Sequence, residues 1–233
     1  MKLVLFDIDG TLLWTDGAGR RAVHHALASV YGVPVPEGHE FDGKTDPQIV
    51  RELMRIAGRP DHVIDASLTR ALDAYVEALR QELDGQDHGD KVYPGIAALL
   101  DQLEAREDVL LGLLTGNVRD GATTKLNAVG IDAARFRVGA FGSDHADRRE
   151  LPAIAQRRAE ALLGDRVAGH DVVVIGDTPA DMRCGLGIGA RAIGVATGRY
   201  SVADLSAHEG IVFPDLADTP AVLAAILLTG PTP

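Results

Sequence analysis

Two aspartates, Asp7 and Asp9, are the first residues in the chain whose type and spacing could serve catalysis. They directly follow an apolar segment at residues 3–6, in the sequence Asp-Ile-Asp-Gly-Thr. In an open parallel sheet, ligands bind beyond the carboxyl ends of the strands, where both side chains would lie. One carboxylate can attack phosphorus and form an acyl phosphate, while the other transfers protons. The sequence Asp-x-Asp-Gly by itself is also typical of a plain turn.

Two further aspartates follow a later apolar segment at residues 172–175. Asp177 lies close after this segment, and Asp181 comes four residues further on, in the first turn of a predicted helix. Carboxylates that crowd one edge of a sheet repel each other. A hard divalent cation relieves this repulsion, and Mg²⁺ favours carboxylate oxygens together with phosphate and water. The aspartates therefore predict a Mg²⁺ site that would also neutralise charge on a phosphoryl group.

A third set of polar residues follows the apolar segment at residues 109–114. Thr115, Gly116 and Asn117 come directly after it and precede a predicted helix. A hydroxyl, an amide and free backbone N–H groups at a helix N-terminus can bind an anion, although such a sequence is also typical of a helix cap. Because all three sets occur in one chain, each after an apolar segment, we interpret them as one site for a phosphate compound.

The pattern of apolar residues predicts the fold that would position these side chains. Short apolar runs at 3–6, 109–114, 172–175 and 190–195 are typical of buried strands, and segments with helical spacing separate them. Strands that alternate with amphipathic helices predict an α/β protein with a parallel sheet covered on both faces.

Residues 16–90 have a different pattern, with three apolar helical faces and no convincing strand. We therefore predict an all-helical insert at 16–90, placed after the first strand of a core that comprises residues 1–15 and 91–233. The polar residues 85–90 would close the insert as a linker.

Composition limits the partners and the location of the protein. Acidic residues outnumber basic ones by 34 to 23, and the net charge of −11 argues against binding nucleic acid or an anionic membrane. No apolar stretch approaches the length of a membrane span, and the first apolar run is too short for a signal peptide. Cys184 is the single cysteine, which excludes an internal disulfide and fits a cytoplasmic protein. The oligomeric state is not predictable.

Taken together, the motifs resemble those of the haloacid dehalogenase superfamily of phosphohydrolases. Residues 7–11 match its first motif, Asp-x-Asp-Gly-Thr. Residues 114–117 match its second, and residues 176–181 match its fourth, Gly-Asp-x-x-x-Asp. The resemblance covers essentially the whole chain. It implies a Rossmann-like core with a small helical cap domain inserted after the first motif.

The resemblance also implies a role for each matched residue. Asp7 would be the nucleophile and Asp9 the general acid and base. Mg²⁺ would be held by the Asp7 carboxylate, the Asp9 backbone carbonyl and Asp177, with Asp181 acting through water or by orienting its neighbours. The residues that would bind the phosphoryl oxygens are Thr115, Gly116 and Asn117.

The third motif is where this chain departs from the family, which usually has a lysine there, often as Lys-Pro-x-Pro. Alignment on Pro152 places Arg149 at the lysine position. Arginine can neutralise the same charge, although its planar group reaches differently. Arg148 is a second candidate and Lys125 a weaker one. The two arginines could also be solvated residues at the start of a helix.

The leaving group of the substrate would be selected by the cap. Lys44, in the sequence Gly-Lys-Thr-Asp at 43–46, could pair with a substrate carboxylate, or the loop could be a plain helix start capped by Thr45 or Asp46.

The predicted activity is Mg²⁺-dependent hydrolysis of a small phosphorylated metabolite through an aspartyl-phosphate intermediate on Asp7. The resemblance is closest to phosphoglycolate phosphatase-like members, and Asp9 favours a phosphate ester because a halide leaving group needs no proton. Two alternatives remain, a β-phosphoglucomutase-like phosphosugar mutase and a non-catalytic sensor of a phosphorylated ligand.

Overall fold

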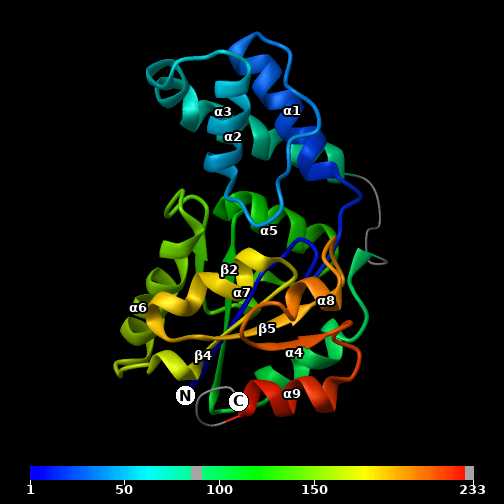
Figure 1. Ribbon diagram of the computed structural model, residues 1–233, viewed down its shortest axis with the longest axis vertical. Coiled ribbons are helices and arrows are strands. Elements are labelled where there is room, and N and C mark those ends of the chain that lie inside the picture. The colour runs from blue at the N-terminus through cyan, green and yellow to red at the C-terminus, as the bar shows by residue number, and fades with distance from the viewer. Residues whose placement is uncertain (85–90, 229–233) are drawn as a thin grey trace.

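A parallel sheet forms the centre of the computed structural model, which describes residues 1–84 and 91–228 (Figure 1). The six strands of this sheet lie in the order β3-β2-β1-β4-β5-β6. The chain thus adds β2 and β3 on one side of β1 and then crosses over to add β4 on the other. Their bounds are β1 Lys2–Phe6, β2 Val109–Thr115, β3 Val138–Phe141, β4 Val172–Gly176, β5 Arg191–Val195 and β6 Ile211–Phe213.

Consecutive side chains of a strand point to opposite faces of the sheet, and apolar side chains are buried on both faces. In β1, Val4 and Phe6 belong to one apolar cluster, and Leu3 and Leu5 belong to another. The first cluster includes residues of α4 (Ile96–Glu104), α5 (Arg119–Ala128) and α9 (Thr219–Leu227). The second includes residues of α6 (Leu151–Leu163) and Cys184 of α7 (Pro179–Cys184). Helices therefore cover both faces, and the predicted α/β class is confirmed.

Three helices occupy the described residues between β1 and α4. They are α1 (Ala18–Tyr31), α2 (Asp46–Ile56) and α3 (Asp61–Leu83), and they pack around an apolar cluster of their own. Figure 1 shows them together at one end of the molecule, above α5. The described part of residues 16–90 contains no strand, as expected. The division at residues 15/16 and 90/91 stays a prediction, and the predicted linker at 85–90 lies outside the described residues.

Smaller elements complete the core. The short helix α8 (Val202–Leu205) packs near β5 and β6. A 3₁₀ turn at Arg148–Glu150 leads into α6 and, as described below, aims one side chain at the end of β1. None of the described helices has the length and the apolar character needed to cross a membrane.

Candidate active site

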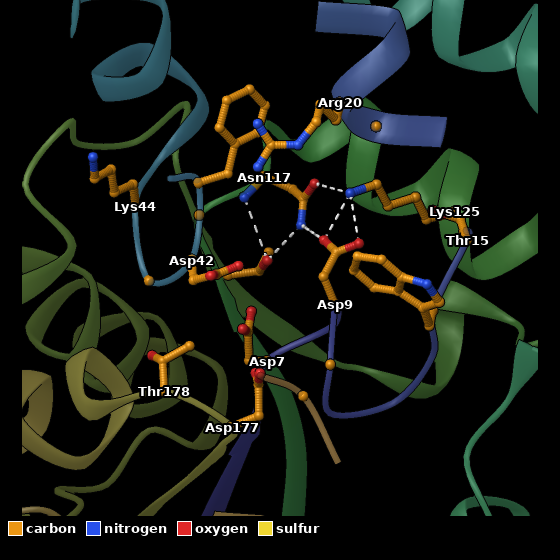
Figure 2. A pocket seen from close by; sticks show the side chains of 18 of the residues that line it. Asp7, Asp9, Thr15, Arg20, Asp42, Lys44, Asn117, Lys125, Asp177 and Thr178 are labelled. Atoms are coloured by element: carbon orange, nitrogen blue, oxygen red, sulfur yellow. Dashed lines mark hydrogen bonds and ion pairs between the residues drawn. The ribbon is translucent and has the colours of Figure 1, made fainter. Parts of the chain in front are cut away.

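The carboxyl ends of β1, β2 and β4 meet at a cavity of about 580 Å³ between the sheet and the helices α1–α3. Because β1 lies between β2 and β4, the residues that follow these three strands become neighbours. Figure 2 shows the carboxylates of Asp7 and Asp177 close to each other, with Asp9 and Asn117 above them. The structure thus brings the three predicted sets together, and the cavity is lined by Asp7, Asp9, Thr115, Gly116, Asn117 and Asp177.

Two glycines allow the chain to wrap tightly around Asp177. Gly10 has a φ of +79°, and a Cβ atom there would lie 2.3 Å from Asp177 Oδ2. A Cβ atom on Gly198 would lie 1.8 Å from the same oxygen. The hydroxyl of Thr11 donates to Asp177 Oδ1 at 3.3 Å. The position of this carboxylate is therefore fixed by close backbone contact from two loops.

Three buried carboxylates form a cluster below the cavity. Asp7, Asp177 and Asp181 each offer an oxygen, and these oxygens lie within 4.8 Å of one another. Burial raises the pKa of Asp7 to about 6; Asp181 and Asp9 add to this rise, while Arg148 opposes it. Burial, Asp181 and Asp7 also raise the pKa of Asp177 well above its usual range. Placing these acids together in the folded chain is therefore electrostatically unfavourable.

This oxygen cluster fits a hard divalent cation such as Mg²⁺. Its donors are carboxylates, and a cation between them would offset the repulsion that raises the pKa values of Asp7 and Asp177. Asp181 has other partners as well. Its carboxylate accepts from the Thr178 hydroxyl at 2.6 Å and the Thr178 backbone N–H at 3.1 Å, and it forms an ion pair with Arg148. Thr178 is the N-cap of α7, and Asp181 completes the capping box as its third helical residue, so part of its hydrogen-bonding capacity is used within the helix start.

The carboxylate of Asp9 lies outside this cluster and is bound by Asn117, which follows β2, and by Lys125 of α5. The Lys125 ammonium donates to both Asp9 oxygens, at 2.8 and 2.7 Å, and the Asn117 amide donates to Asp9 Oδ2 at 2.8 Å. The same amide group also donates to the Thr115 hydroxyl at 2.8 Å, and Lys125 donates to Asn117 Oδ1 at 2.8 Å. The second motif therefore positions the predicted proton-transfer residue as well as lining the cavity (Figure 2).

The structure corrects the assignment at the third motif. Arg149 lies outside the cavity, with a side chain that is 80% exposed and paired with Asp147. Arg148 is buried and points inward, where it forms ion pairs with Asp7 Oδ2 at 3.2 Å and with Asp181. The reason is the 3₁₀ turn at Arg148–Glu150, whose consecutive side chains face different directions. Alignment on Pro152 was therefore wrong by one residue.

Lys44 lines the cavity, but its charge is compensated. Its ammonium lies 2.6 Å from Glu52 and 3.2 Å from the His39 ring. Figure 2 shows this ammonium pointing away from Asp7 and Asp177. The helix-start interpretation of the loop also applies, since the Thr45 hydroxyl accepts from the backbone N–H of Gln48 and caps α2.

The same loop fastens the helices α1–α3 to the second motif. The Asp46 backbone N–H donates to the Gly116 carbonyl at 2.8 Å, and the Asp46 carboxylate accepts from the Val118 N–H at 2.8 Å. A Cβ atom on Gly116 would lie 1.9 Å from the Lys44 carbonyl oxygen. Burial raises the pKa of Asp46 to about 6, although Lys125 and the Val118 N–H oppose the rise. The loop and the second motif thus meet without space between them.

A family model described as haloacid dehalogenase-like hydrolase matches residues 1–189. The chain belongs to this family. The predicted membership of the haloacid dehalogenase hydrolases and the predicted hydrolase class are therefore confirmed.

Two curated relatives match most or nearly all of the chain. N-acetylmuramic acid 6-phosphate phosphatase of Pseudomonas aeruginosa is 31% identical, over 90% of this chain and 88% of the relative. Phosphoglycolate phosphatase of Agrobacterium fabrum is 25% identical, over 98% and 95%. Among solved structures, a β-phosphoglucomutase from Clostridium difficile has a TM-score of 0.70 at 17% identity, covering 94% of this chain and 92% of that one. This last likeness shows the haloacid dehalogenase fold alone.

Three contacts of this haloacid dehalogenase-like site were not predicted from the sequence. Lys125 was considered as a substitute for the third-motif lysine, yet it binds Asp9 instead of Asp7. Asp46 was considered as a helix cap, and its contact with Val118 was unexpected. Arg20, on α1, lines the cavity but has no motif around it that could have indicated this.

Proposed function

We propose that the protein is a Mg²⁺-dependent phosphatase that hydrolyses a small phosphorylated metabolite through an aspartyl-phosphate intermediate on Asp7. The observation that carries the proposal is one cavity lined by Asp7, Asp9 and Thr115, with the carboxylate cluster at its base. The phosphatases among the curated relatives support the same reaction type.

In the first step, a carboxylate oxygen of Asp7 attacks phosphorus, and the bond between phosphorus and the ester oxygen breaks. Arg148 lies 3.2 Å from Asp7 Oδ2 and, by opposing the effect of burial, favours the ionised nucleophile. The hydroxyl of Thr115, the backbone of Gly116 and the Asn117 amide line the cavity where the phosphoryl oxygens would lie. Asp9, carrying a proton, gives it to the departing oxygen.

In the second step, Asp9 accepts a proton from water, whose oxygen attacks the phosphorus of the aspartyl phosphate. The bond from phosphorus to Asp7 breaks, which releases inorganic phosphate and restores the carboxylate. Asp9 suits this role, because Lys125 and Asn117 donate three hydrogen bonds that orient its carboxylate as an acceptor.

A Mg²⁺ ion would be held by the carboxylates of Asp7 and Asp177, the Asp9 backbone carbonyl and, through water, Asp181. When bound, it would supply positive charge that offsets the charge of the phosphoryl group. The proposed substrate is a small molecule, and we expect the protein to bind neither nucleic acid nor a membrane. The cytoplasmic location stays a prediction.

Release of inorganic phosphate from p-nitrophenyl phosphate tests the proposal. We expect turnover with Mg²⁺, none after chelation, and none in Asp7→Asn, because an amide cannot form the phosphoenzyme. Asp16→Asn is the matched control, since Asp16 is exposed, pairs with Lys91 and does not line the cavity. Full activity of Asp7→Asn would refute the nucleophile, and activity without any divalent cation would refute the metal site.

The two alternatives predict different products. A phosphosugar mutase would convert one hexose phosphate into its isomer with little free phosphate, and a sensor would bind phosphorylated compounds without turnover. A panel of phosphorylated metabolites, assayed for free phosphate and for isomerised sugar phosphate, therefore distinguishes all three functions.

A further inference from the structure

One basic side chain that lines the cavity has no role in the proposed reaction. Of the basic residues that line it, Arg148 and Lys125 bind the catalytic acids. Lys44 is paired with Glu52, and Arg199 lies 2.7 Å from Glu40. Arg20 also lines the cavity, and within residues 1–84 and 91–228 it forms no ion pair. Its charge is therefore available to a ligand.

Two contacts hold the Arg20 side chain in place. Its guanidinium carbon lies 4.0 Å from the centroid of the Phe41 ring, and its Nη1 donates to the His39 carbonyl at 2.7 Å. Stacking on an aromatic ring and one hydrogen bond fix the plane of the group, yet a guanidinium has five N–H donors. Figure 2 shows Arg20 on the side of the cavity formed by α1, above Asn117. Arg20 is thus oriented in advance and keeps donors for an anion.

The rest of the cavity restricts where a second anion could bind. The carboxylates of Asp7 and Asp177 at the base disfavour a second anion there. The residues that line the cavity also include Trp14, Tyr75 and Tyr93, whose rings suit the carbon body of a ligand. An anion at the far end of the substrate would therefore find its complementary charge at Arg20.

We propose that Arg20 is a specificity-determining residue that selects substrates with a second anionic group, a carboxylate or a phosphate, on the leaving group. This inference rests on the proposed phosphatase reaction. A volume of about 580 Å³ also leaves room for a substrate with a body of the size of a sugar acid or a sugar bisphosphate.

Two pairs of substrates that differ only in the second anion test this inference. They are 6-phosphogluconate with sorbitol 6-phosphate, and phosphoglycolate with 2-hydroxyethyl phosphate. We expect wild type to favour the carboxylate member of the first pair by about fivefold in kcat/KM, mainly through KM, because Arg20 is exposed and solvent screens the ion pair that it forms. The second pair spans less of the cavity, so its ratio should be smaller.

The variants are Arg20→Gln, Arg20→Lys and, as a matched control, Arg21→Gln. Arg21 is the next residue on α1, pairs with Glu82 and does not line the cavity. Arg20→Gln should bring the ratio of the first pair close to one, Arg20→Lys should keep part of it, and Arg21→Gln should keep all of it. A wild-type ratio near one in the first pair would overturn the inference, as would an unchanged ratio in Arg20→Gln.

A calorimetric titration keeps this result separate from the failure of the proposed function. If wild type releases no phosphate even from p-nitrophenyl phosphate, the phosphatase proposal fails. The affinities of wild type and Arg20→Gln for 6-phosphogluconate and sorbitol 6-phosphate then decide the role of Arg20 alone. Tighter binding of the carboxylate compound that depends on Arg20 supports it, and equal binding of both compounds refutes it.

Discussion

Replacing Arg148 by methionine tests how strongly one buried cation holds the acidic cluster together. Arg148 contacts Asp7 and Asp181, and both carboxylates are buried with Asp177. Methionine fills a similar volume but leaves these acids without their guanidinium partner. Breaking a buried ion pair from one side costs about 3 to 5 kcal/mol, and proton uptake by the remaining acids limits the loss. We therefore expect the free energy of unfolding to fall by about 3 kcal/mol at pH 7 without divalent cations.

The loss should depend on pH and on Mg²⁺. The pKa of Asp7 lies at about 6, so at pH 5 this group is mostly protonated and the ion pair contributes less. The variant should therefore lose less stability at pH 5 than at pH 7. If Mg²⁺ binds the cluster, its charge should also recover part of the loss.

Urea denaturation followed by circular dichroism measures these differences, with Arg149→Met as the matched control. Arg149 is the adjacent residue, but it is exposed and pairs with Asp147 at the surface, so its replacement should leave the denaturation midpoint unchanged. The turnover number of Arg148→Met should also fall by about a hundredfold, as after loss of one stabilising donor. Equal effects of the two replacements, or a larger effect of Arg149→Met, would refute the assignment.

Two further predictions concern the loop at residues 43–46, which leads into α2 and contacts the second motif. The pKa of Asp46 is about 6, above its ordinary 3.8, so the contribution of this group to wild-type stability should fall as the pH rises from about 4 past 6. Asp46→Asn should reduce this fall by on the order of 3 kcal/mol in urea titrations, and an unchanged pH dependence would contradict the burial of its charge. Gly116→Ala should displace the Lys44 backbone and lower kcat/KM by about a hundredfold. Hydrogen exchange at residues 42–46 should then be faster, and unchanged exchange would count against this contact.

Much of the fold could be predicted because its buried strands are continuous apolar runs. The expected segments at 3–6, 109–114, 172–175 and 190–195 correspond to β1, β2, β4 and β5, and every end agrees within one residue. The strands β3 and β6 were not predicted. They have four and three residues, the sequence of β3 contains Gly139, and β6 is only partly buried, so neither has a distinct periodic pattern.

The site was predictable where a residue follows a strand directly, and less so elsewhere. Asp7, Thr115 and Asp177 are placed by the strand ends themselves, so their meeting follows from the order of the sheet. The choice between Arg148 and Arg149 depends on the phase of a three-residue turn, which sequence spacing does not determine. The contact of Lys125 with Asp9 depends on how α5 packs, which again is a tertiary property.

The absence of a side chain at Gly116 has a consequence for protein engineering. The Lys44 backbone rests where a Cβ atom would otherwise be, so two segments about 70 residues apart in the sequence share one small volume. A chimera that takes its helical insert from another member of the family would succeed only if the donor loop follows the same backbone path past residue 116. Exchange of substrate preference between relatives should therefore require transfer of this loop and its facing glycine as one unit.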